Sequence, residues 1–185
     1  MLSKKLLYLQ IPLNTVLWGC ESWSMTEEIK RELRVFHHKA IRRILNINMF
    51  DVEKYHIKNQ SVRRSFLDSH DIVDTVTQRQ LKWIGKLANK AQDNIAFKIL
   101  AAWSKNPRTP GKPQSNTRRT YAKVIKEIVP TLKDNGLLKT WLPVARSKDS
   151  WNDLVQKWLD SKTESLITNF PPAPIYPNPR IRAET

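Results

Sequence analysis

Paired carboxylates are the side chains that a nucleotide polymerase needs, because two divalent cations must be held close together on primer and nucleotide. The chain has no Asp-Asp pair. Asp68, Asp71 and Asp74 are spaced by three residues and could share one helical face. Acidic residues are also common at helix starts, where they offset the helix dipole. We therefore expect these aspartates to mark a helix start and not a metal site.

Histidine and cysteine do not form a recognisable reactive motif either. The chain has one cysteine, Cys20, and four histidines: His37, His38, His56 and His70. None of the histidines stands in an HExxH or similar spacing. His37 and His38 are adjacent, and because adjacent residues on a helix point about 100° apart, the two rings cannot share a metal ion in the usual way. We expect His38 on a basic helix face, where it is solvated or contacts phosphate, and Cys20 as a small buried residue. The sequence also lacks the glycine-rich phosphate-binding motifs, so we predict no metal site, no cofactor and no small-molecule substrate.

Positive charge is the chemistry that the chain has in excess. Its 185 residues include 32 Lys and Arg against 17 Asp and Glu, for a formal net charge of +15. The pI of 10.1 is typical of nucleic-acid-binding domains, although anionic lipid would also be attracted. The excess is concentrated between Lys105 and Lys126, where seven residues are basic and none is acidic. This block runs from a Pro- and Gly-containing loop into a predicted helix.

Basic side chains bind nucleic acid because contact with phosphates releases condensed counterions. Arg118 and Arg119 follow Thr117 at a predicted helix start, where free backbone amides can also hold a phosphate. For an isolated arginine pair, simple solvation would be the alternative. We predict contacts to RNA, DNA or an RNA–DNA hybrid through these residues: Arg31, Arg34, Arg42, Lys105, Arg108, Lys112, Arg118, Arg119 and Lys123.

Helices are the elements that must position these side chains. Ser24 and Glu27 have the spacing of a capping box. Apolar residues then recur every three or four positions, which predicts a buried stripe: Ile29, Leu33, Phe36, Ala40, Ile44 and Ile47. Because Arg31, Arg34 and Arg42 lie off this stripe, we expect them on the solvent side.

Further helices are predicted over residues 71–90, 93–103 and 117–130, and from residue 149 or 150 onward. Asp71 is the expected N-cap of the first of these, and Gly85 within it would permit a close helix contact. Several tryptophans stand at apolar helix positions, where core packing is more common than base stacking: Trp83, Trp103, Trp141, Trp151 and Trp158. No segment alternates as a strand does. The fold class is all-α, a compact bundle of about five to seven helices.

The two ends of the chain have a different character. Residues 1–19 are moderately apolar but interrupted by Gln10, Pro12 and Asn14, which predicts neither a transmembrane helix nor a signal peptide. We therefore expect no membrane partner and a nuclear or cytoplasmic protein that is not secreted. The segment 169–185 is rich in proline and is predicted to be a disordered, extended tail.

Five short motifs follow one another between residues 10 and 160. Val16–Trp23 resembles the stretch "LLYGCETW", and Leu33–Ile47 resembles "LxxFxxRxLRRILGI". Arg79–Lys86 is similar to "RRLRWLGH", Arg108–Lys126 to "GRPRxTWxDxI", and Ala145–Val155 to "AxDRxxWRxLV". This order of motifs resembles the region that follows the palm in reverse transcriptases of non-LTR, LINE-type retrotransposons. The chain departs from the family pattern at Asn46, Lys86 and Tyr121.

The resemblance implies a thumb-like helical region that grips the template–primer duplex of a parent RNA-directed DNA polymerase. It implies four segments: 1–104 thumb-like, 105–116 a basic loop, 117–168 C-terminal helices, and 169–185 the tail. The catalytic aspartates of the palm would lie before Met1, so the chain would not be an enzyme on its own. Two alternatives stay open: a degenerate element copy without activity, and a host-adopted helical scaffold that binds proteins.

Overall fold

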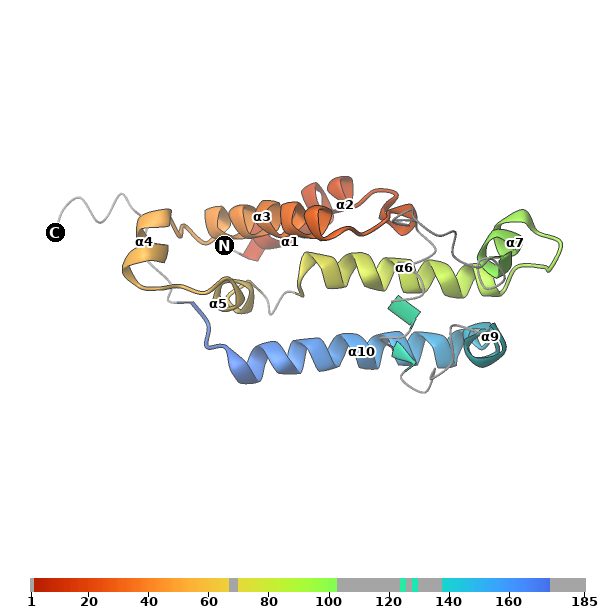
Figure 1. Cartoon of the computed structure of the whole chain (residues 1–185). Helices are drawn as coiled ribbons and strands as arrows, with labels where there is room; N and C mark the ends of the chain where they lie inside the picture. Colours follow the sequence, from red (N-terminus) through yellow and green to blue (C-terminus); the bar gives the residue numbers. More distant parts are fainter. Residues whose placement is uncertain (1, 67–69, 103–123, 126–127, 130–137, 174–185) are drawn as a thin grey trace, which may run out of the picture. The chain divides into compact units, whose positions relative to one another are not determined.

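The computed structural model of the chain describes residues 2–66, 70–102, 124–125, 128–129 and 138–173 (Figure 1). Every regular element in these residues is helical, which confirms the predicted all-α class. The α-helices are α1 (Leu2–Gln10), α2 (Pro12–Val16), α3 (Glu27–Ile44), α4 (Met49–Lys54), α5 (Asn59–Arg64), α6 (Ile72–Ala88), α7 (Ile95–Ala102), α9 (Leu138–Arg146) and α10 (Lys148–Asn169). A short 3-10 helix, η1, spans Cys20–Ser22. None of the described helices has both the length and the hydropathy needed to cross a bilayer.

The chain divides into two compact units. The first contains residues 1–18, 28–74 and 160–185, and the second contains residues 19–27 and 75–159. Both α6 and α10 contribute residues to each unit. The segment boundaries predicted near residues 105 and 117 lie outside the described residues.

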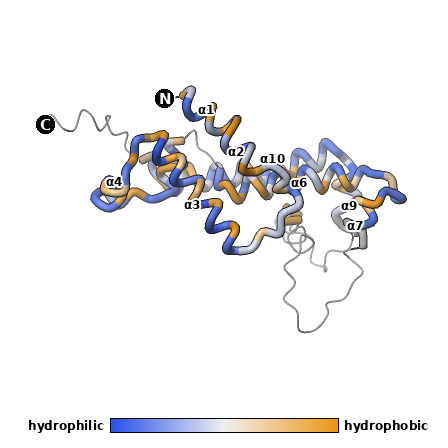
Figure 2. Tube along the Cα trace, turned by 90° about the horizontal axis from the view of Figure 1, so that it is seen from above, coloured by the Kyte–Doolittle hydropathy of each residue, from blue (hydrophilic) through white to orange (hydrophobic). Residues whose placement is uncertain are grey.

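The core of the second unit is built by amphipathic helices. Hydrophilic and hydrophobic residues are interspersed along the helices (Figure 2). Their buried side chains join those of α9 and of the described residues before it in one cluster: Leu81, Ile84, Leu87, Ala88, Val124, Ile125, Ile128, Trp141, Ala145, Trp151, Val155, Trp158 and Leu159. The core positions predicted for Trp141, Trp151 and Trp158 are therefore confirmed.

The predicted core position of Trp83 is wrong, because 40% of its surface is exposed. Leu81 and Ile84 define the inward face of α6, and Trp83 lies on the helix side that they leave to solvent. Trp103 lies outside the described residues.

Gly85 allows α6 and α10 to approach closely, as the sequence predicted. The Trp151 indole donates a hydrogen bond to the Leu81 carbonyl at 2.8 Å, one helical turn before Gly85. A Cβ atom at Gly85 would lie 2.5 Å from Cδ1 of Trp151 and 2.7 Å from its Nε1. The indole thus occupies the space that a side chain would need. Asn89, directly after α6, donates a hydrogen bond to the Ala145 carbonyl of α9 at 3.0 Å.

The first unit is centred on Tyr8 of α1. Its hydroxyl is hydrogen-bonded to Nδ1 of His37 on α3 at 2.9 Å. Its ring meets Phe66, just after α5, edge to face with centroids 5.8 Å apart. Tyr8 therefore links three segments that are distant in sequence.

The inward face of α3 differs from the predicted stripe. Leu33 and Ile47 are buried as predicted, but Phe36 is 38% exposed, and His37 and Ile41 are buried in its place. The buried face of α3 is thus shifted by one residue from the predicted one, because His37 faces Tyr8. The proposed capping box is also wrong, because α3 begins at Glu27, so that Thr26 and not Ser24 is the residue directly before the helix.

The other predicted helix starts are close to the observed ones. The Asp71 carboxylate accepts the Val73 amide at 3.0 Å, which confirms Asp71 as a cap of α6. At the start of α7, the Asn94 side chain accepts the Ala96 amide at 3.0 Å, one residue beyond the predicted Asp93. The last helix begins at Lys148, next to the predicted position.

The proline-rich segment is ordered where it leaves α10. The Ala173 amide donates to the Ser61 carbonyl at 3.1 Å, and the Ser65 hydroxyl donates to the Ala173 carbonyl at 3.0 Å. For residues 170–173 the structure thus shows a specific attachment to α5 where disorder was expected. Residues 174–185 lie outside the described part of the chain.

Replacing Gly85 with alanine should destabilise the protein. Overpacking against the enclosed Trp151 is expected to cost about 1–3 kcal/mol, and better helix propensity offsets about 1 kcal/mol of this. Urea unfolding should show a net loss of stability for Gly85→Ala. Lys86→Ala, an exposed change on the same helix, should alter stability by no more than about 0.5 kcal/mol. A Gly85→Ala variant as stable as the wild type would contradict the close approach.

Candidate nucleic-acid interface

The nine residues predicted to contact nucleic acid fall into two groups. Six of them lie outside the described residues: Lys105, Arg108, Lys112, Arg118, Arg119 and Lys123. The other three, Arg31, Arg34 and Arg42, lie on α3 in the first unit. The structure therefore bears on the geometry of the α3 group alone.

Arg31 is exposed, as predicted, so its guanidinium is accessible from solvent. Arg42 is half-buried, and its Nη1 donates to the Asn59 side chain at 3.1 Å. This bond joins α3 to α5 while engaging one of the five donors of the guanidinium. Arg42 can therefore hold the helices together and still present donors to a phosphate.

Arg34 has a structural partner. Its Nε lies 2.9 Å from Oδ2 of Asp71, the residue that also caps α6. Burial of Asp71 opposes its ionisation, but the Val73 amide and the Arg34 guanidinium outweigh this and lower the pKa of Asp71. A phosphate contact by Arg34 would require this ion pair to open. The structure thus distinguishes the paired Arg34 from the exposed Arg31, although sequence position alone placed both on the same helix face.

The second half of α3 extends the positive charge. Between Leu33 and Phe50 the chain has four basic residues and no acidic one. Of these, Lys39 and Arg43 are exposed, and neither was among the predicted contacts. The signal that could have identified them is the run without acidic residues.

Buried histidines lie beneath this basic surface. His37 is buried and His38 is half-buried, with ring centroids 6.1 Å apart. The prediction of a solvated His38 is therefore wrong. The Nε2 atoms of both rings are buried, with no hydrogen-bond partner among the described residues. Desolvation by burial lowers the pKa of each ring to about 4, and neighbouring positive charge, including that of Arg63, acts in the same direction.

Cys20 behaves as predicted. It is buried in the second unit, and Gln80 donates to its backbone carbonyl at 3.2 Å. Burial raises the pKa of its thiol to about 11, with Glu21 adding to the effect. Because the thiolate is the reactive form and the raised pKa disfavours it, the Cys20 thiol is not an activated nucleophile.

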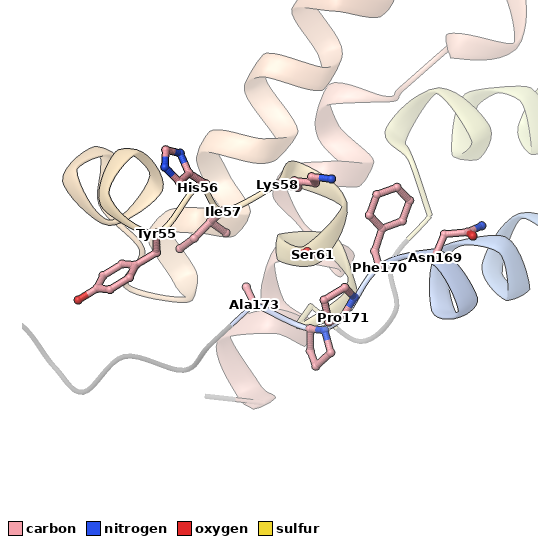
Figure 3. A pocket seen from close by; sticks show the side chains of 10 residues that line it. Tyr55, His56, Ile57, Lys58, Ser61, Asn169, Phe170, Pro171 and Ala173 are labelled. Atoms are coloured by element: carbon pink, nitrogen blue, oxygen red, sulfur yellow. The ribbon is translucent and has the colours of Figure 1, made fainter.

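A groove in the first unit was not predicted. It has a volume of about 280 Å³ and is lined by the loop between α4 and α5 and by the segment that follows α10. Figure 3 shows its lining: Tyr55, His56, Ile57, Lys58, Ser61, Asn169, Phe170, Pro171, Pro172 and Ala173. No local sequence pattern indicates it, because its two walls are far apart in the chain.

Comparison with known proteins finds no matching family model, no matching curated protein and no matching solved structure.

Acid should destabilise the chain well above the pH at which carboxylates are protonated. Histidine in the unfolded chain has a pKa of about 6.5, whereas His37 and His38 have folded values of about 4. The unfolded state therefore binds more protons, and stability falls as the pH falls from about 6.5 towards 4. We expect His37 alone to contribute a loss on the order of 2 kcal/mol between neutral pH and pH ~4.5 in urea unfolding, with a smaller addition from the more exposed His38.

The variant His37→Gln keeps a polar side chain at this position but cannot take up a proton. Its stability should therefore depend less steeply on pH over the same range, by up to one proton. A slope identical to that of the wild type would show that His37 is not the group that titrates.

Proposed function

We propose that the chain is the nucleic-acid-binding, post-palm helical region of a non-LTR retrotransposon reverse transcriptase, and that it grips a template–primer duplex. The observation that carries the proposal is the block from Lys105 to Lys126, with seven basic residues and no acidic one. The fourth of the five motifs that occur in the family's order, Arg108–Lys126, lies within this block. The partner would be RNA, DNA or an RNA–DNA hybrid.

The described residues support such a grip by their charge. The whole chain has 32 basic residues against 17 acidic ones. Among the described residues, the buried carboxylate of Asp51 is satisfied by the backbone amide of Asn48 at the start of α4. Arg31, Lys39 and Arg43 are exposed on α3. Such side chains bind the phosphate backbone without reading base sequence, so little sequence preference is expected.

The proposed role is binding and not catalysis. Phosphoryl transfer by two metal ions needs paired carboxylates, and the sequence contains no Asp-Asp pair. In the proposed parent protein, a palm would supply the catalytic aspartates. A degenerate copy of the same region would have no binding that selection maintains.

A helical scaffold that binds proteins is a second candidate function. Exposed apolar side chains on and just after α1 favour it: Leu2, Leu6, Leu7 and Ile11. A scaffold of this kind would use apolar contacts, so its binding would depend little on salt. The salt response therefore separates the two functions.

The affinity of the chain for a random-sequence RNA–DNA hybrid should fall steeply with salt. If about five phosphate contacts form, log K should decrease with log salt with a slope of roughly −4 to −5. Fluorescence anisotropy between low and moderate salt measures this slope. A flat response, or no binding at low salt, would contradict an electrostatic grip.

Replacing Arg118 and Arg119 with alanine should weaken binding equally for all sequences. The salt slope should become shallower by about one to two units, one for each lost phosphate contact. Circular dichroism and melting temperature should change little if both residues face solvent. The control pair Lys162→Ala and Arg180→Ala lies in residues 151–185, which are neutral overall, and should leave the slope nearly unchanged. Equal effects of both pairs would place the grip elsewhere.

A further inference from the structure

The groove of the first unit brings aromatic rings and lysines together. Tyr55 is 49% exposed, and the Lys54 ammonium lies 5.3 Å from the centre of its ring. Phe170 is half-buried, and the Lys58 ammonium lies 6.0 Å from its ring centre. In Figure 3, Ile57, Ser61 and Ala173 lie between Tyr55 and the Phe170 side of the lining. The groove therefore has an aromatic ring at Phe170 with Lys58 beside it, and the exposed ring of Tyr55 projects from its edge with Lys54 beside it.

The charge around the groove favours an anionic ligand. None of the described residues that line it is acidic. From Lys54 to Phe66 the chain has four basic residues and no acidic one. A phosphate beside Lys58 would therefore meet no nearby carboxylate along this stretch of the chain.

The wall formed by the chain's C-terminal segment is held in place. Ala173 is hydrogen-bonded to Ser61 and Ser65 of the α5 region, and the Arg64 guanidinium donates to the Ile167 carbonyl near the end of α10. These bonds fix Phe170 and Pro171 against α5. A ligand would thus meet a preformed wall, which reduces the conformational entropy lost on binding.

We propose that this groove binds an unpaired nucleotide of an RNA or DNA strand. The base lies against Tyr55 or Phe170, and its phosphate lies at Lys58. Proteins that bind single strands combine such aromatic faces with basic grooves, whereas the bases of a duplex are stacked on one another and cannot reach a ring. The inference rests on the proposed function for the class of partner, and it adds a site for unpaired strand beside the duplex grip.

The test compares three labelled probes on the full chain by fluorescence anisotropy. They are a short oligouridylate, an abasic oligomer with the same number of phosphates, and an RNA–DNA hybrid. The wild type should bind the oligouridylate about tenfold more tightly than the abasic oligomer, because stacking is available only to the former. Equal affinities for these two probes would overturn the proposal.

The variant Tyr55→Leu/Phe170→Leu keeps apolar bulk but removes both flat rings. It should lose the preference for oligouridylate while still binding the abasic oligomer and the hybrid like the wild type. Phe50→Leu is the matched control, because Phe50 is 65% exposed with Lys54 at 5.6 Å but does not line the groove. Tyr55→Phe keeps the ring and should keep the preference. If the double variant retains the preference, the groove is not the site.

Ultraviolet crosslinking of oligouridylate to the wild-type chain gives a readout that needs no variant. Crosslinks at Tyr55 or Phe170 support the proposal, and crosslinks found only elsewhere overturn it. An acidic peptide that binds the groove as tightly as oligouridylate would identify a protein ligand instead. Loss of hybrid binding alone counts against the proposed duplex grip and leaves this inference standing, so the two can fail separately.

Discussion

The contact between the Trp151 indole and the bare backbone at Gly85 is the constraint on which the second unit depends. Because the indole also donates to the Leu81 carbonyl, it fixes both the spacing and the register of α6 against α10. The tryptophan of α9 then packs beside it, with the two ring centroids 6.3 Å apart. The apolar cluster around these rings provides the hydrophobic stabilisation that a strongly basic chain needs, because its like charges repel one another in the compact state.

The interior of the first unit, unlike the apolar core of the second, is partly polar. Tyr8 and His37 meet through a hydrogen bond, and Arg34 pairs with Asp71 where α6 begins. Burial keeps the histidines neutral, so this interior adds no positive charge beneath the basic surface of α3. In the described part of the chain, the exposed cations Arg31, Lys39 and Arg43 of α3 are left where a polyanion could neutralise them. Folding and the proposed binding of nucleic acid are thus compatible demands on this composition.

Local patterns predicted those features that depend on neighbours in the sequence. The Asp71 cap, the close approach at Gly85 and the buried tryptophans of α9 and α10 are of this kind. The capping box of α4 could also have been predicted, because Asn48 and Asp51 have the right spacing. Their side chains and backbone amides form hydrogen bonds of 2.8 and 3.0 Å. The orientation of α3 could not have been predicted in this way, because Tyr8, the partner of the buried His37, lies on α1. The groove could not have been predicted either: Ser65 and Ala173, whose hydrogen bond holds one wall, are 108 residues apart.

The most direct test of the account is a lysine-reactivity footprint. The chain is acylated with and without a saturating random-sequence RNA–DNA hybrid, and the modified lysines are quantified by mass spectrometry. A nucleic-acid grip in residues 105–126 should strongly protect Lys105, Lys112 and Lys123 and leave Lys162 equally reactive in both samples. Protection of Lys162 to the same extent, or protection of no lysine between residues 105 and 126, would contradict a nucleic-acid grip in that block.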